Sequence, residues 1–213
     1  MHNRIDLLRP DAPALAQPGP HPVGVTTLTA PVSDTRQLTL EVWYPAAEGT
    51  GAGTSYATLL RDGVTPTVLH GSACREAFVA TGISAPLIVI SHGYPGNRFL
   101  LSHLAESLAR QGFVVAAPDH AGSTYEDQQA FGVTLLNRPL DQRAVIDAME
   151  ALTGPLGDLV ACRRVGLIGY SMGGYGAMIF GGAGLAEEAL QHPRAPEGGS
   201  LARHLAGSKT HAA

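Results

Sequence analysis

One short segment constrains this chain more than any other, because it joins a strand to a helix through a turn with almost no side chains. Val165–Ile168 is an apolar run typical of a buried strand, and Gly169-Tyr170-Ser171-Met172-Gly173 follows it directly. A serine on so tight a turn takes strained backbone angles, and the positions two before and two after it need glycine to avoid clashes. Gly169 and Gly173 meet that need, so the pattern predicts a nucleophile elbow that exposes Ser171 above a sheet.

A second interpretation of these residues is a glycine-rich turn with an incidental serine, since G-x-S-x-G also arises by chance. The apolar run before the turn and the small Gly174 and Gly176 after it favour the elbow, because they supply the strand and the closely packed helix that the motif needs. We therefore predict that Ser171 is a nucleophile. The first free N–H of the next helix, that of Met172, is then expected to face a developing oxyanion.

Strand and helix patterns alternate from residue 87 to about residue 183, which predicts an α/β fold with a parallel sheet. Two earlier strands are close enough in sequence to form a hairpin. Residues 46–86 are rich in Gly, Ser and Thr, so we expect an irregular rim of a substrate pocket with one short helix near 74–80. The expected strands are 23–30, 38–44, 87–91, 113–117 and 165–168, and the expected helices are 100–111 and 139–152, the latter with Leu140, Ala144, Val145, Ala148 and Leu152 toward the core.

Composition describes one ordinary globular core and argues against several classes of partner. The 213 residues carry a formal net charge of −4, which offers no basic surface for nucleic acid or an anionic membrane. No apolar run approaches the ~20 residues of a membrane span, and residues 1–10 lack the apolar core of a secretory signal. Cys74 and Cys162 show no metal-type spacing. We therefore expect a cytoplasmic protein with reduced thiols. We divide the chain into an N-terminal lead-in at 1–22, an α/β core at 23–185 and an irregular tail at 186–213.

A second oxyanion donor is expected in the turn after the apolar strand 87–91, because an acyl-transfer site needs two such donors. Gly93 lets the backbone of this turn approach a substrate closely. We therefore predict that the backbone N–H of Tyr94 is the second donor.

Two histidines close to these turns are candidates for the general base. His92 ends the strand 87–91, where a histidine is more often a hydrogen-bonded structural residue. His120 follows Asp119 at the end of the next strand, and there we expect the carboxylate to hold turn amides. Both positions also precede Ser171, whereas the catalytic histidine of such a site comes last in the chain.

Five spaced motifs occur in order along the chain. They are Val42-Trp43-Tyr44-Pro45, Ile90-Ser91-His92-Gly93 with Asn97-Arg98, Pro118-Asp119-His120-Ala121-Gly122, Arg138-Pro139-Leu140-Asp141 and Gly169-Tyr170-Ser171-Met172-Gly173-Gly174. Together they resemble the α/β-hydrolase family, most closely its dienelactone-hydrolase and platelet-activating-factor-acetylhydrolase-like branch and more distantly the cutinase-type polyesterases. The resemblance covers roughly residues 20–185.

The resemblance implies an α/β-hydrolase fold, with a mostly parallel central sheet flanked by helices, and hydrolysis of a carboxylic ester. It implies that Ser171 is the nucleophile, that Tyr94 and Met172 form the oxyanion hole, and that neither a metal nor an organic cofactor is needed. The substrate is expected to be a small-molecule or lipid-like ester, and fold analogy does not choose among lipid acetyl esters, lactones and polyesters.

The chain departs from the family after Ser171, where the triad acid and histidine are expected. No Asp follows Ser171, and residues 181–213 contain no Val, Ile, Phe, Tyr or Trp from which to build a strand. We expect that the C-terminal part of the fold, with its last strands, is missing, and that Val165–Ile168 forms an exposed sheet edge prone to self-association. Glu187, Glu188 and Glu197 with His192, His204 and His211 satisfy the triad order only formally.

Two further functions stay open at this point. One is a catalytically silent or incomplete domain with a binding or assembly role, which the lack of an identifiable acid and histidine favours. The other keeps the fold but hydrolyses an amide or a thioester. Labelling of Ser171 by a fluorophosphonate tests the first, and a substrate panel tests the second.

Overall fold

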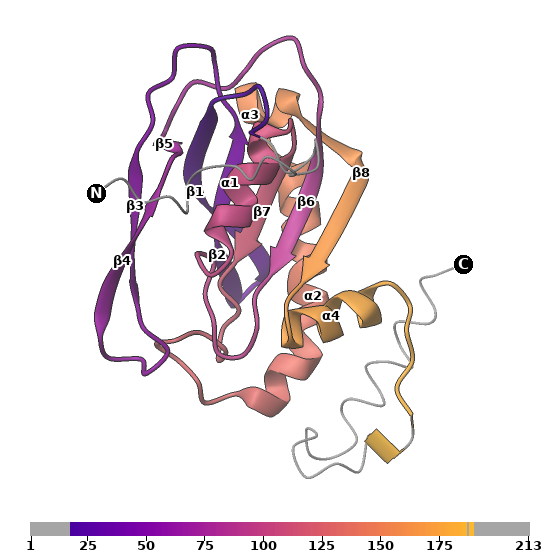
Figure 1. Ribbon diagram of the computed structural model, residues 1–213. Coiled ribbons are helices and arrows are strands. Elements are labelled where there is room, and N and C mark those ends of the chain that lie inside the picture. Colours follow the sequence, from indigo (N-terminus) through magenta and orange to yellow (C-terminus); the bar gives the residue numbers. More distant parts are fainter. Residues whose placement is uncertain (1–17, 187, 190–213) are drawn as a thin grey trace, which may run out of the picture.

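The computed structural model describes residues 18–186 and 188–189, which form one mixed sheet with helices on both faces and a separate hairpin beside it (Figure 1). Most of the predicted lead-in and tail lies outside these residues. The strands are β1 (Val23–Ser33), β2 (Arg36–Pro45), β3 (Thr54–Leu59), β4 (Pro66–Gly71), β5 (Cys74–Arg75), β6 (Ala85–Ser91), β7 (Val114–Pro118) and β8 (Val160–Gly169). The helices are α1 (Ser102–Arg110), α2 (Phe131–Glu150), α3 (Gly154–Leu159) and α4 (Met172–Phe180).

The six-stranded sheet has the order β5-β1-β2-β7-β6-β8. The predicted hairpin is confirmed, since β1 and β2 pair antiparallel, and β2 also runs antiparallel to β7. The strands β7, β6 and β8 run parallel, as the alternation of strands and helices predicts. Their carboxyl ends, at Pro118, Ser91 and Gly169, therefore meet at one end of the sheet, where α/β folds bind their ligands.

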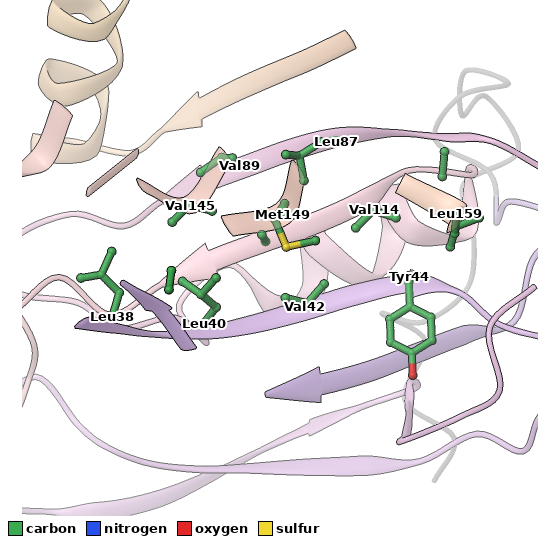
Figure 2. Close-up of a cluster of buried hydrophobic side chains, with 13 residues drawn as sticks. Leu38, Leu40, Val42, Tyr44, Leu87, Val89, Val114, Val145, Met149 and Leu159 are labelled. Atoms are coloured by element: carbon green, nitrogen blue, oxygen red, sulfur yellow. The ribbon is translucent and has the colours of Figure 1, made fainter. Parts of the chain in front are cut away.

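Side chains alternate between the two faces of this sheet, and each face builds its own apolar core. The core on the α2 side includes Leu38, Leu40, Val42, Tyr44, Leu87, Val89, Val114, Val145, Met149 and Leu159 (Figure 2). The core on the α1 side contains Trp43, Ile88, Val115 and Ala105. The alternation of apolar residues in β2 therefore separates two cores, not a core from solvent. Full burial of side chains of this size contributes roughly 2 kcal/mol each.

The prediction of an irregular loop at 46–86 is wrong. β3 and β4 pair as a two-stranded sheet, and Cys74–Arg75 pairs with β1 as β5 in place of the helix expected near 74–80. β4 is mostly exposed and β3 buries a single residue, so no apolar alternation marks the two strands in the sequence. The buried residue is Tyr56, whose hydroxyl accepts a hydrogen bond from Trp43 Nε1 at 2.8 Å and donates to Glu106 Oε1 at 2.7 Å.

The helix predicted at 139–152 begins earlier, at Phe131, so that Pro139 lies inside it. The predicted core face is only partly right, since Val145 is buried whereas Leu140 is 39% exposed. Arg138 and Asp141, which lie near Leu140 in the helix, are almost fully buried instead. Polar residues on a helix usually face solvent. Arg138 and Asp141 are buried because each makes hydrogen bonds or ion pairs beneath the end of the sheet.

The elbow strand lies at the edge of the sheet, as predicted. Among the described residues β8 pairs with β6 alone, and Val165 is 38% exposed. Figure 1 shows β8 at the side of the sheet away from the β3–β4 hairpin. None of the described helices is long and apolar enough to cross a membrane.

Candidate active site

Ser171 stands between the last residue of β8 and the first residue of α4. Its φ of 53° and ψ of −116° lie outside the regions that serine ordinarily adopts, and the residue is exposed. A Cβ on Gly169 would lie 2.3 Å from the carbonyl oxygen of Gly173, and a Cβ on Gly173 would lie 2.0 Å from that of Ser91. Both glycines are therefore needed for space. The turn has the strained serine and the two close glycines that the sequence predicts, whereas a nucleophile elbow and the catalytic role of Ser171 stay predictions.

The turn after β6 lies directly against this elbow. A Cβ placed on Gly93 would lie 3.2 Å from the Cβ of Ser171 and 3.0 Å from the ring of Tyr170. A side chain at residue 93 would thus fill the space beside the serine. The turn continues into Tyr94, which is joined to Pro95 by a cis peptide bond.

The two predicted oxyanion donors make no hydrogen bond to the described residues. Within α4, the N–H of Gly173 donates to the carbonyl oxygen of Tyr170 at 2.8 Å, and the N–H of Gly174 donates to that of Ser171 at 2.9 Å. The N–H groups of Met172 and Tyr94, by contrast, have no hydrogen-bond partner within the described part of the chain. They are thus open to a ligand, and their role as an oxyanion hole stays a prediction.

His92 has no free ring nitrogen for a general base. Its Nε2 accepts a hydrogen bond from the backbone N–H of His120 at 3.2 Å, so its Nδ1 carries the proton and donates to the carbonyl oxygen of Gly93 at 2.7 Å. Burial, with further contributions from His120 and Arg138, holds the pKa of His92 well below its ordinary value. The residue is a neutral structural histidine, as its place at a strand end predicts.

Asp119 holds a turn amide, which also agrees with the sequence prediction. Its Oδ1 accepts a hydrogen bond from the backbone N–H of Arg98 at 2.6 Å, and its Oδ2 pairs with the Arg98 guanidinium. His120 does not pair with Asp119, its neighbour in sequence. The two residues leave the end of β7 in different directions and belong to different networks.

The partner of His120 is Asp141, a residue that the sequence analysis places only within a family motif. His120 Nδ1 lies 2.8 Å from Asp141 Oδ2, and His120 Nε2 lies 2.9 Å from Ser91 Oγ. This row repeats the order of groups in a serine, histidine and acid triad. All three residues are at most 1% exposed, so no substrate reaches Ser91. We assign the row a structural role at the ends of β6 and β7.

Charges in this buried row are balanced by two arginines. Burial raises the pKa of Asp141 to about 6, although Arg36 and Arg138 oppose the rise. Burial also holds the pKa of His120 well below its ordinary value. At neutral pH His120 is therefore neutral, donates its Nδ1 proton to the ionised Asp141 and accepts at Nε2 from the Ser91 hydroxyl.

Arg138 connects this row to the turn beside Ser171. Its Nη1 donates to Ser91 Oγ at 3.2 Å and to the carbonyl oxygen of His92, and its Nη2 donates to the carbonyl oxygen of Gly93 at 3.0 Å. Burial lowers the pKa of Arg138 to about 9, and Asp141 opposes the shift, so the guanidinium stays charged at neutral pH. From sequence, only the Arg138-Pro139-Leu140-Asp141 motif gives a signal for these residues.

The formal acid and base candidates of the tail are not brought to the site by the described residues. Glu187, Glu197, His192, His204 and His211 lie outside them, and Glu188 is exposed. The described residues also contain no group of three or more His, Cys, Asp or Glu side chains that would hold a metal ion. A cavity of about 1130 Å³ lies at the opposite end of the sheet, where it is lined by Tyr44, Leu152 and others, so we do not assign it to Ser171.

Comparison with known proteins agrees with this fold and these motifs. The sequence model of a family described as platelet-activating factor acetylhydrolase, isoform II, matches residues 59–144. A solved ferulic acid esterase from Streptomyces cinnamoneus is similar in structure, with a TM-score of 0.56 and 25% sequence identity over 85% of this chain. The present chain spans 59% of that esterase. No curated protein matches the sequence. With the sheet order and the strand-to-helix turn at Ser171, these matches support an α/β-hydrolase fold and a likeness to the group of platelet-activating-factor acetylhydrolase and dienelactone hydrolase.

Proposed function

We propose that residues 23–185 form the nucleophile-bearing domain of a serine hydrolase that acts on carboxylic esters. The observation that supports this most is the pair of free N–H groups, of Tyr94 and Met172, on the two turns that flank the exposed Ser171. Free donors at such a turn are suited to a developing negative charge. Similarity to a ferulic acid esterase and to the acetylhydrolase family supports an ester as the substrate.

In the proposed reaction, Ser171 Oγ attacks the ester carbonyl carbon while its proton passes to a general base. The carbonyl oxygen becomes an oxyanion, which the N–H groups of Tyr94 and Met172 stabilise. The tetrahedral intermediate then expels the alcohol, which takes up the proton, and leaves an acyl group on Ser171. Water releases the carboxylic acid by the same steps.

The proton acceptor in this scheme lies outside the described residues. His92 and His120 are the histidines beside the elbow, and all four of their ring nitrogens are engaged. We therefore propose that a histidine oriented by an Asp, both supplied from outside the described residues, completes the site. A serine without its base retains only the small rate enhancement of the oxyanion hole and of substrate binding.

Aromatic side chains lie on and next to the two turns of the proposed site and favour an apolar substrate. Tyr94 and Phe131 pack edge to face with ring centroids 5.0 Å apart. Tyr170, next to Ser171 in the chain, is 57% exposed. Burial raises the pKa of Tyr125; the charge of Arg61 opposes the rise, and Tyr170 adds a smaller contribution to it. We propose that these rings contact the acyl or alcohol group of the ester, since aromatic faces bind apolar and aromatic groups alike.

The first test measures hydrolysis of p-nitrophenyl acetate, p-nitrophenyl butyrate and methyl ferulate by the wild-type chain and by Ser171→Ala. Ser107→Ala, which changes an exposed serine on α1, is the matched control. We expect hydrolysis by the wild type and the control, and none by Ser171→Ala. Ester hydrolysis that persists in Ser171→Ala would refute the assigned nucleophile. Faster cleavage of thioester or anilide analogues would favour the alternative acyl hydrolase.

A silent binding or assembly domain is the second candidate, because the histidines beside the elbow are fully engaged. Phosphonylation distinguishes it from an enzyme that lacks only its base. A fluorophosphonate that adds slowly to Ser171, without measurable ester hydrolysis, would show a nucleophile awaiting a base. Failure to add even after long incubation would support the silent domain.

A further inference from the structure

The peptide group that carries the Tyr94 N–H is held from its other side. The Gly93 carbonyl oxygen accepts two hydrogen bonds, from His92 Nδ1 at 2.7 Å and from Arg138 Nη2 at 3.0 Å. The Gly93–Tyr94 bond is trans, since among the described residues only the Tyr94–Pro95 bond is cis. In a trans peptide the N–H points opposite to the carbonyl oxygen. The two buried donors therefore turn the Tyr94 N–H away from the interior.

Arg138 is placed to hold the whole turn through the two arms of its guanidinium. The residue is fully buried. Nη1 binds the His92 carbonyl oxygen and Ser91 Oγ, and Nη2 binds the Gly93 carbonyl oxygen and Ser123 Oγ. Its Nε has no partner among the described residues, so the contacts all pass through the terminal nitrogens. A rigid fork of donors suits two successive carbonyl groups, which a lysine ammonium cannot hold in the same way.

A role in packing alone does not account for this arginine. A buried charge loses its hydration, and a well-packed apolar residue of similar volume often serves stability as well or better. Every neighbour of the guanidinium named above belongs to, or directly supports, the turn after β6. That turn is also the one that approaches Ser171, through Gly93.

We propose that Arg138 is a positioning residue that directs the Tyr94 N–H toward the oxyanion by holding the carbonyl groups of His92 and Gly93. The inference rests on the proposed function and deepens it. A rotation of the Gly93–Tyr94 peptide would leave His92 Nδ1 and one of the two Arg138 Nη2 protons without an acceptor in a buried place, which keeps the N–H on the Ser171 side. Arg138 itself touches neither substrate nor reacting atoms.

The test follows the backbone amide signals of ¹⁵N-labelled protein before and after Ser171 is phosphonylated with a fluorophosphonate. An amide that donates to the phosphonyl oxygen moves downfield. In the wild type we expect the amide protons of Tyr94 and Met172 to move. In Arg138→Lys, which keeps the charge and loses the fork, the displacement of Tyr94 should fall to less than half while that of Met172 is kept.

Ser123→Ala is the matched control. It removes one hydrogen bond from the same Arg138 Nη2 without touching a carbonyl group of the turn, so the Tyr94 displacement should stay as in the wild type. If the protein turns over an ester, Arg138→Lys should lower kcat about tenfold or more with KM little changed, because the loss concerns the transition state.

The outcomes separate the two proposals. An adduct whose Tyr94 displacement is equal in the wild type and in Arg138→Lys would overturn the positioning role and leave Ser171 as the nucleophile. No adduct in the wild type would overturn the proposed function, and this inference with it. If Arg138→Lys does not fold, the wild type alone provides the test. An adduct that polarises the Gly93–Tyr94 peptide should then shift the NMR signals of the Arg138 Nη2 protons, which donate to the Gly93 carbonyl oxygen. Signals that do not move would refute the positioning role.

Discussion

The backbone N–H of Tyr170 donates to the carbonyl oxygen of Ser91 at 3.0 Å, so the turn that carries Ser171 is fixed to the end of the neighbouring strand. On the other side of this carbonyl group lies Gly173, where an added Cβ would come within 2.0 Å of the same oxygen. The place of the elbow is therefore set by direct contact between two backbones.

Gly173→Ala should destabilise the fold far more than Gly174→Ala. The methyl group at residue 173 meets backbone atoms of Ser91 and His92, which cannot turn aside as a side chain can, and we expect a loss of about 3 kcal/mol. At residue 174 the nearest atom is 3.3 Å away and alanine improves helix propensity, so the change should stay within about 1 kcal/mol. Urea denaturation measures both, and equal effects would contradict the steric argument.

Ser171→Gly should stabilise the chain while removing its activity. With φ at 53°, Ser171 is in a backbone conformation that glycine adopts freely, and relief of the strain is expected to raise the free energy of unfolding by about 1 kcal/mol. Ser171→Ala keeps a Cβ and should leave stability unchanged. Thermal or urea unfolding compares the two variants, and the idea fails if Ser171→Gly is no more stable than Ser171→Ala.

Stability should fall as the pH drops below about 6.5. Burial holds the pKa of His92 and of His120 well below the ordinary value, so only the unfolded chain gains their protons. The unfolded state then binds more protons, and the stability present above pH 6.5 is lost on acidification. Asp141 partly offsets this loss of stability. Its pKa in the folded protein is raised to about 6, so on acidification the folded state binds the Asp141 proton before the unfolded chain does.

The net loss between pH 7.5 and pH 6 should be about 1 kcal/mol. Urea denaturation at pH 7.5, 6.5 and 6 measures it. His103→Gln, which changes an exposed histidine of α1, should show the same dependence as the wild type. A free energy of unfolding that does not change over this range would show that the two histidines are not buried as neutral groups.

The edge of β8 should cause association that rises with protein concentration. We propose that β8 pairs with another copy, because among the described residues its outer edge has no neighbour and Val165 is exposed there. Val165→Lys should reduce the association, whereas Val133→Lys, at an exposed position of α2, should not. Sedimentation velocity at several concentrations tests this, and equal association of both variants would exclude the edge as the interface.

Tyr56→Phe should destabilise the chain by about 2 kcal/mol, because it leaves Trp43 Nε1 and Glu106 Oε1 each without a buried partner. Tyr170→Phe removes a hydroxyl from an exposed ring and should change stability by less than about 0.5 kcal/mol. The pair is compared by urea denaturation. A small effect at Tyr56 would mean that the hairpin is held mainly by other contacts.

Features that depend on local geometry are the ones that the sequence predicts well. The tight strand-to-helix turn at Ser171 follows from the steric limits on five consecutive residues, and the order of strands and helices follows from the hydrophobic period. The β3–β4 hairpin escapes prediction because Tyr56 is its one buried apolar side chain in the described strands, and an exposed two-stranded sheet leaves no periodic pattern.

The buried polar network escapes for a different reason. His120 stands next to Asp119 in sequence, yet it pairs with Asp141, and Arg138 reaches a turn that precedes it by more than forty residues. These pairings depend on how α2 packs under the end of the sheet. A local sequence pattern cannot predict such contacts, because the partners lie far apart in the chain. Arg138 and Asp141 are also charged, so a prediction based on polarity places them on the solvent-exposed face of the helix, although both are buried.

The tip of the β3–β4 hairpin is a segment that protein engineering can replace. The hairpin is joined to the body near its base, where Tyr56 and Ser72 meet Glu106, while its tip between Leu59 and Pro66 reaches the loop after β7 through the Arg61 carbonyl group. Neither apolar core draws a side chain from that tip. Loops of other lengths and sequences grafted there would therefore diversify the surface beside the loop after β7 in a library whose members keep the same folding core.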